Sequence, residues 1–300
     1  MSEKIEVVFL GTGSAMPTAR KNHQAVWIKF KGETLLFDCG EGTQRQIRIA
    51  KLNPCKITRI FISHWHGDHI LGIPGLLWTL ALSDYKGELE VYIPKGTKRY
   101  MDTLLNFFVF VGKINISVRE VDRGVVFENK DFKIIAERMQ HTAKCLGYSF
   151  VEKDMLRIDK KKLKKLKIKP GPELAKIKLG KDVSINGKKI KAKSLTYEES
   201  GRKITIIPDT LKFPLLSKFA DKSDLLISES SFLDEIHLAE EKKHLTSIDA
   251  AQIANKSKSK KLFLVHISQR YEANEKELLK NARKYFKNTE IPKDLDRVYL

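Results

Sequence analysis

Short apolar runs and longer amphipathic stretches follow one another along the whole chain. The apolar runs end in turns or polar residues and predict strands. They cover 5–10, 24–30, 34–37, 58–63, 89–93, 114–121, 132–138, 146–151, 203–207, 225–228 and 262–265. Stretches with helical spacing cover 41–50, 70–81, 247–254 and 274–286. Because strands and helices are mixed throughout, we expect an α/β protein whose sheets are covered by helices.

One segment, residues 153–193, breaks this pattern. Asp159 is expected to cap a short helix that runs through Lys167, and a second short helix is expected from Glu173 to Lys178. Asn186-Gly187 predicts the turn of a hairpin over 184–190. These elements carry too few apolar residues for a core of their own. We therefore expect one domain over 1–300, with 153–193 as an inserted arm that projects from it.

Charge sets this segment apart. The chain has 56 Lys and Arg against 37 Asp and Glu, a net charge of +19 and a pI near 9.6. Residues 153–193 hold sixteen basic and four acidic residues, so +12 lies there and +7 in the rest. Such an excess attracts polyanions and favours nucleic acid or an anionic membrane as a partner. The alternative is a solvated insertion that binds nothing, because blocks of like charge are often only solvated.

Composition narrows the class of protein. A hydrophobic fraction of 42% with 31% charged residues is globular and excludes wholesale disorder. No apolar run reaches the roughly 18 residues of a membrane span, and the N-terminus lacks the zones of a signal peptide. Three cysteines, odd in number and widely spaced, argue against a disulfide framework. We expect a reduced, cytoplasmic protein without a membrane partner.

Four potential metal ligands occupy six positions directly after the predicted strand 58–63. They are His64, His66, Asp68 and His69. Imidazole and carboxylate together suit zinc, and also manganese or another divalent ion. Side chains alternate along an extended segment, so the first two can face one side and the last two another, beyond a bend at Gly67. One loop can thus serve two neighbouring ions.

Two ions need more than four ligands, and three further residues follow predicted strands. His141 follows 132–138, Asp209 follows 203–207, and His266 follows 262–265. Alone, each has an ordinary interpretation as a hydrogen-bonded histidine or a turn aspartate. Open α/β sheets place their sites at strand ends, however, and four strands here are each followed by ligands. A carboxylate can bridge two cations, so Asp209 is the natural bridge.

These motifs resemble a known family. Residues 61–69 resemble the HxHxDH signature of the metallo-β-lactamase superfamily, and residues 9–17, 36–44 and 264–271 resemble motifs of its ribonuclease Z family. The resemblance runs from residue 6 to about 285. It implies an αββα sandwich with two metals at one edge, and an endonuclease that trims precursor tRNA on the 3′ side.

The resemblance also implies roles for individual residues. One zinc takes His64, His66, His141 and Asp209, and the other takes Asp68, His69, Asp209 and His266. Asp38 supports the metal loop without ligating. Two such ions can clamp a phosphodiester and activate water, which Asp68 would orient and deprotonate.

A proton donor for the leaving 3′-oxygen is implied as well. His244 resembles the histidine of the family's H-x-T loop, and Glu229 the acid of its H-E-A-T stretch. We expect His244 to act as general acid and Glu229 to orient it. Ser228, Ser230, Ser231 and Leu245 depart from these patterns. His23 and His237 match no motif and are expected at the surface.

RNA contacts are implied for two regions, in a homodimer whose one arm holds the tRNA cut by the other subunit. The arm supplies phosphate contacts that do not depend on the identity of the bases. The loop 17–22 resembles one near the RNA 3′ end, with Lys21 where arginine is usual. Expected RNA-binding residues are Arg20, Lys21, Asn22, Lys160, Lys161, Lys162, Lys164, Lys165, Gly171 and Pro172. Two alternatives stay open, a small-molecule phosphodiesterase of the same fold and an RNA-binding protein without activity.

Overall fold

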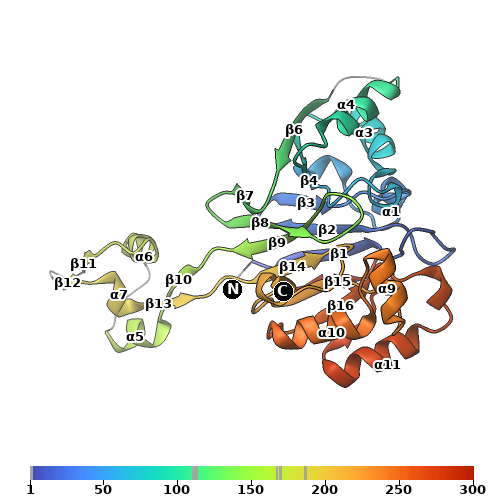
Figure 1. Ribbon diagram of the computed structural model, residues 1–300. Coiled ribbons are helices and arrows are strands. Elements are labelled where there is room, and N and C mark those ends of the chain that lie inside the picture. The colour runs from blue at the N-terminus through green and yellow to red at the C-terminus, as the bar shows by residue number, and fades with distance from the viewer. Residues whose placement is uncertain (1–2, 110–113, 167, 169–170, 186–187) are drawn as a thin grey trace.

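The computed structural model describes residues 3–109, 114–166, 168, 171–185 and 188–300. Two seven-stranded sheets pack face to face, and helices cover both outer faces (Figure 1). The first sheet contains, in order, β18 (Arg297–Tyr299), β1 (Glu6–Gly11), β2 (Ala25–Phe30), β3 (Glu33–Phe37), β4 (Arg59–Phe61), β5 (Glu88–Pro94) and β6 (Asn115–Val121). The second contains β17 (Thr289–Glu290), β16 (Leu262–Val265), β15 (Leu225–Glu229), β14 (Lys203–Ile207), β9 (Cys145–Glu152), β8 (Phe132–Met139) and β7 (Gly124–Glu128).

The core lies in three apolar layers. Between the sheets, aromatic side chains from both sides meet, and Phe30 packs edge-on against Phe150 at 5.7 Å. The outer face of the first sheet is covered by α1 (Thr43–Ile49), α2 (Gly67–Ile70), α3 (Ile73–Leu82) and α4 (Lys98–Phe107). The second is flanked by α8 (Leu215–Phe219), α9 (Ile236–Lys242), α10 (Ser247–Lys256) and α11 (Glu275–Tyr285). Among the described residues, no helix is both long and apolar enough to cross a bilayer.

The predicted strands and long helices are present, with ends shifted by a few residues. The predicted helix 70–81 is instead two helices, α2 and α3, because the chain turns at Gly72, where a side chain would collide with the backbone oxygen of Gly40. The turn that joins β2 to β3 is formed by Lys31 and Gly32, both at positive φ. Short 3₁₀ turns lie at Pro54–Lys56 and Gln269–Tyr271.

The segment inserted between β9 and β14 extends away from the sandwich (Figure 1). Its stalk is the antiparallel pair β10 (Met155–Ile158) and β13 (Thr196–Glu199). Beyond the stalk lie α5 (Lys160–Lys165), α6 (Pro172–Lys178), β11 (Val183–Ile185), β12 (Lys188–Ile190) and α7 (Ala192–Leu195). Asp159 caps α5 as predicted, by accepting hydrogen bonds from the backbone of Lys161 and Lys162. Lys167 and the Asn186-Gly187 turn lie outside the described residues.

The expectation that this segment has no core of its own was wrong. Ile177, Val183, Ala192 and Leu195 form a separate buried cluster, with further apolar side chains packed around it. They come from α6, β11 and α7, which are joined by turns that bring single apolar residues of each element together. The segment 155–199 is therefore a small folded unit on a two-stranded stalk, hereafter the arm.

Candidate metal centre

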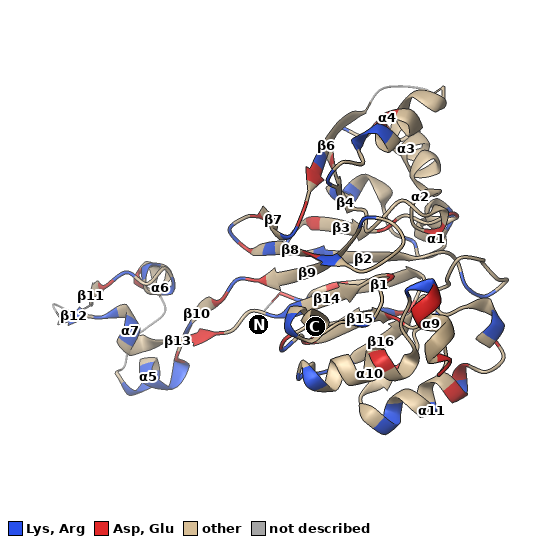
Figure 2. Ribbon diagram, in the orientation of Figure 1, with Lys and Arg blue, Asp and Glu red and all other residues tan. Residues whose placement is uncertain are grey.

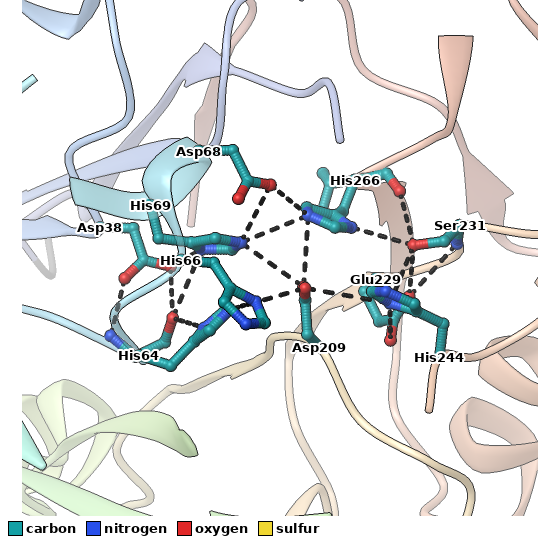
Figure 3. Close-up of polar contacts among 12 residues, drawn as sticks. Asp38, His64, His66, Asp68, His69, Asp209, Glu229, Ser231, His244 and His266 are labelled. Atoms are coloured by element: carbon teal, nitrogen blue, oxygen red, sulfur yellow. Dashed lines mark hydrogen bonds and ion pairs between the residues drawn. The ribbon is translucent and has the colours of Figure 1, made fainter. Parts of the chain in front are cut away.

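The predicted ligands meet because strand direction brings their segments to one edge of the sandwich. β3, β4 and β5 are parallel to one another, and so are β14, β15 and β16. β8 runs antiparallel to β9, which runs antiparallel to β14, so β8 ends at the same edge as β14. His64, His141, Asp209 and His266 each follow one of these strand ends. Residues almost 200 positions apart thereby share one site (Figure 3).

The first ligand group contains three histidines and one carboxylate oxygen. His64 Nε2 lies 3.0 Å from His66 Nδ1, and His141 Nε2 lies 3.2 Å from the same atom. Asp209 Oδ2 lies 3.7 Å from His64 Nε2 and 3.6 Å from His141 Nε2. All four ligand atoms lie within 4.8 Å of one another. In a tetrahedron with metal–nitrogen bonds of about 2.1 Å, ligand atoms are roughly 3.4 Å apart, so this spacing fits one ion.

The second group lies on the other side of Asp209. His266 Nε2 is 3.1 Å from Asp68 Oδ2 and 3.3 Å from His69 Nε2. Asp209 Oδ1, the second oxygen of that carboxylate, is 3.3 Å from His266 Nε2 and 3.6 Å from His69 Nε2. The two oxygens of Asp209 therefore face two different ligand groups, which is the geometry of a bridging ligand.

The buried polar atoms of this cluster are evidence that it binds cations. Asp209 is 2% exposed, and its Oδ1 accepts no hydrogen bond from any described residue. An orphaned buried carboxylate oxygen is costly unless a cation compensates it. Burial lowers the pKa of His64, His66 and His141, which keeps these rings neutral with a lone pair for a metal. The donor set and its spacing can hold two divalent ions.

Neighbouring groups orient the ligands. Asp38 accepts hydrogen bonds from the backbone NH and the hydroxyl of Ser63, at 2.7 and 2.8 Å. Its Oδ2 also lies 2.8 Å from His69 Nδ1, so Nε2 of that ring faces the ligand group. Burial opposes charge on His69, but Asp209 and Asp38 raise its pKa well above the usual value. Asp38 and His266 both adopt left-handed φ, 57° and 55°, a conformation that residues at functional sites often adopt despite its cost. Asp38 thus lies where the predicted supporting role requires it.

A carboxylate–imidazole pair lies beside the ligands. His244 Nδ1 is 3.1 Å from Glu229 Oε1 and 3.2 Å from Oε2. Glu229 is fully buried and also accepts the backbone NH of Thr210 at 2.8 Å. Burial by itself lowers the pKa of His244, but the Glu229 carboxylate and, to a smaller extent, that of Asp209 outweigh it and raise this pKa to about 9. His244 is therefore protonated at neutral pH.

Ser231 is a candidate site residue that the sequence did not single out. Its hydroxyl donates to Glu229 Oε2 at 2.8 Å and lies 3.2 Å from His244 Nδ1 and 2.9 Å from His266 Nδ1 (Figure 3). It links the Glu229–His244 pair to His266, a predicted ligand. The sequence indicated only a serine in place of the usual threonine, and both residues carry the hydroxyl that these contacts need.

The loop predicted to bind RNA, 17–22, comes shortly after Ser14 and Ala15, which help to line a cavity beside the ligand groups. Arg20 is exposed, whereas the Lys21 ammonium is buried in an ion pair of 2.9 Å with Glu275. Asn22 donates to the backbone oxygen of Glu41 at 2.6 Å. In the arm, the lysines predicted to bind RNA all lie on α5: Lys160, Lys161, Lys162, Lys164 and Lys165. Gly171 directly precedes α6, and Pro172 is its first residue.

The two remaining histidines, His23 and His237, differ in burial. His237 is exposed, as predicted. His23 is only 4% exposed, and neither ring nitrogen has a hydrogen-bond partner among the described residues. The prediction of a surface His23 was wrong, because the loop around it folds beneath Gly40, whose Cα faces the His23 side chain and the backbone oxygen of Asp68.

Known proteins are similar to this chain in sequence and in fold. A family model described as Anti-Pycsar protein Apyc1 matches residues 5–156, which include the metal loop but end before Asp209. Ribonuclease Z of Bacillus cereus (strain ZK / E33L) is 39% identical over 302 residues, covering 97% of this chain and 98% of that protein. The chain belongs to the ribonuclease Z family. Ribonuclease Z of Nanoarchaeum equitans is also 39% identical, over 267 residues that cover 89% of this chain and 84% of that protein.

Solved structures agree with this membership. The short form of human tRNase Z superposes with a TM-score of 0.69 at 28% identity, covering 98% of both chains. The metallo-β-lactamase fold protein YhfI of Bacillus subtilis superposes with a TM-score of 0.73 at 16% identity over both full chains, which shows the fold alone. The predicted metallo-β-lactamase sandwich is therefore confirmed, and this member of the ribonuclease Z family is a metal-dependent hydrolase, as predicted.

Proposed function

We propose that this chain is an endoribonuclease that cuts precursor tRNA on its 3′ side and leaves a 3′-hydroxyl on the tRNA. One observation carries the proposal. In a chain 39% identical to a ribonuclease Z over nearly its full length, members of both ligand groups and His244 line one cavity of about 480 Å³. A phosphodiester placed there meets both the metal ligands and a proton donor.

The ligand groups are proposed to hold two zinc ions, because imidazole and carboxylate donors suit zinc; manganese or another divalent ion fits the same donors. Once bound, two such cations polarise the phosphodiester and the attacking water. Asp68 uses Oδ2 to meet His69 and His266, and its other oxygen makes no hydrogen bond to a described residue. We assign to that free oxygen the orientation of the water and the acceptance of its proton.

His244 supplies the proton that the leaving 3′-oxygen needs. Its Nδ1 is occupied by Glu229, so Nε2 is the donating atom at the cavity. Water attacks phosphorus, the bond from phosphorus to the 3′-oxygen breaks, and the Nε2 proton passes to that oxygen. A charged imidazole with a fixed orientation is suited to this step.

The arm is proposed as an RNA-binding insertion in a chain that otherwise forms one domain. Its helix α5 begins with three consecutive lysines, and Figure 2 shows this end of the arm in blue. Point charges of this kind hold phosphates without reading bases. The arm is inserted where β9 ends and β14 begins. Cys145, which contacts His64, and the proposed ligand Asp209 lie at the other ends of these strands. The arm therefore points away from the metal centre of its own chain.

This separation supports a homodimer in which the arm of one subunit holds the tRNA that the other cuts. A surface suited to a second copy lies on the helices over the first sheet. Leu71, Leu82, Phe107 and Val109 are 54%, 61%, 77% and 87% exposed there. Exposed apolar side chains on this layer of helices are of the kind that a second copy can cover. We place the enzyme in the cytoplasm, since Cys39, Cys55 and Cys145 are all free thiols.

The test compares two substrates with the purified protein, a precursor tRNA and a small chromogenic phosphodiester, each with and without a chelator. We expect chelator-sensitive cleavage of both, with the precursor strongly preferred. Turnover of the small substrate alone would indicate a small-molecule phosphodiesterase. Binding of the precursor without turnover of either would indicate an RNA-binding protein.

A further inference from the structure

A second cavity adjoins the metal centre, and nothing in the proposed mechanism uses it. It measures about 630 Å³ and opens between the ends of β5 and β6 and the β8–β9 connection. The loop 140–144 separates the two cavities, with His141 and Thr142 on the metal side and Lys144 on the other. Cys145, in its wall, has Sγ 3.7 Å from His64 Nδ1 and 3.5 Å from the backbone oxygen of Asp209. The two cavities are therefore direct neighbours.

The wall of this cavity carries excess positive charge. Lys95, Arg138 and Lys144 line it, against the single carboxylate of Asp122. Arg138 donates to both oxygens of Asp122, so these two charges compensate each other. The Lys144 ammonium bonds only to the backbone oxygen of Lys95, at 3.1 Å, and the Lys95 ammonium makes no hydrogen bond or ion pair in the part of the chain that the structure describes. The ammonium groups of Lys95 and Lys144 are therefore not paired with a carboxylate of any described residue and are free to bind an anion.

The turn that presents Lys95 is held in place. Glu120 Oε1 accepts hydrogen bonds from the backbone NH groups of Gly96, Thr97 and Lys98, each at 2.8 Å. This carboxylate satisfies the amino end of α4, so the helix end is not the place where an anion binds. Gly96 has φ of +81°, and a side chain there would lie 2.6 Å from the Lys144 ammonium. The absence of that side chain lets the Lys144 ammonium approach the turn.

The chemistry of the wall selects which part of a nucleic acid fits. Pro94, Val121, Met139 and Leu146 supply the apolar part of the lining. No aromatic ring is among the described lining residues, so the cavity offers no platform on which a base stacks. Two ammonium groups over an aliphatic wall suit a phosphate with its ribose, whatever base is attached.

We propose that this cavity is a second RNA-backbone subsite, in which Lys95 and Lys144 hold a phosphate next to the scissile one. The proposal rests on the proposed function and adds the place where flanking RNA is held. The phosphate belongs either to the trailer or to the tRNA end, since the same chemistry recognises both. A subsite adjoining the metal centre fixes the register of the chain over the reacting phosphodiester, which binding by a remote arm cannot do.

The experiment uses the full-length protein with Lys95→Gln and Lys144→Gln combined. The matched control is Lys222→Gln with Lys258→Gln, which removes the same charge from exposed lysines that precede β15 and β16, at the sheet edge opposite the metal centre. Precursor RNA with trailers of one and ten nucleotides is titrated with each protein across a salt series. Turnover of the small chromogenic phosphodiester is measured alongside.

We expect the Lys95/Lys144 variant to bind RNA about tenfold more weakly at low salt, with a log–log salt slope smaller by roughly 0.7 for each single-strand phosphate that the variant no longer neutralises. A defect limited to the longer trailer places the phosphate on the trailer, and an equal defect places it on the tRNA. The subsite would be overturned if the Lys95/Lys144 variant had the RNA affinity and salt slope of the control. It would also be overturned if this variant lost turnover of the small phosphodiester. If wild-type protein binds RNA but leaves it uncut, the proposed function fails, while the binding comparison still decides the subsite.

Discussion

Replacing Glu229 with Gln tests the proton donor most specifically. The substitution keeps the size of the side chain and an acceptor for the NH of Thr210, but it removes the negative charge beside His244. That charge raises the pKa of His244 to about 9, against burial that lowers it. Without it, the pKa of His244 is expected at or below its ordinary value of about 6.5.

The size of the effect follows from these values. With a pKa of about 9, His244 is protonated in roughly 30 of 31 molecules at pH 7.5, and with a pKa of about 6.5 in roughly one of eleven. Cleavage at pH 7.5 should therefore fall by about tenfold or more. At pH 6 both forms are mostly protonated and the rates should nearly agree. The ratio should widen as the pH rises toward 9, because only the wild-type imidazole keeps its proton there.

The assay is single-turnover cleavage of a precursor tRNA between pH 6 and pH 10, with metal content measured in parallel. The descending limb should lie near pH 9 for wild type and at least two units lower for Glu229→Gln. Glu241→Gln is the control, since Glu241 is exposed at the rim of the same cavity and pairs with Lys242. A Glu229→Gln enzyme that retains the wild-type limb would refute the assignment of Glu229 as the group that keeps His244 charged.

Three further predictions concern other parts of the molecule. Asp209→Ala should lose both metals together, whereas His64→Ala should chiefly affect one; two fully bound ions in Asp209→Ala by metal analysis would exclude the bridge. Ser231→Ala should slow cleavage by about five- to tenfold, because one hydrogen bond is lost, while the metal content stays intact. Ser231→Thr should restore the rate, and equal rates in wild type and both variants would show that Ser231 has no role in the site. Replacing residues 155–199 by an Asn-Gly turn should weaken precursor binding strongly and spare the small phosphodiester; unchanged binding would mean that the arm is only a solvated insertion.

The features that the sequence predicted best depend on residues close together along the chain. Four ligands within His64–His69 and one ligand after each of several apolar runs are local signals, and strand ends meet at one edge in an open sheet. The cap of α5 by Asp159 was likewise predictable from neighbouring residues.

Contacts that no local motif indicates could not be predicted. Ser231 acquires its role from His244 and His266, which lie 13 and 35 positions away and approach only when β15 and β16 pair. His23 is buried because its loop is covered by the metal loop, and its polar neighbours in sequence gave the opposite expectation. The arm's core could not be predicted because its few apolar residues are distributed over several short elements.

The central claim is that one metal centre with a nearby proton donor cuts precursor tRNA at a defined place. The most direct measurement maps both new ends after the purified protein acts on a precursor of known sequence, with and without chelator. The account predicts a single cut at the 3′ side, a 3′-hydroxyl on the tRNA, a 5′-phosphate on an intact trailer, and no product with chelator. Cleavage at scattered sites, a 3′-phosphate on the tRNA, or unchanged cleavage in chelator would contradict it.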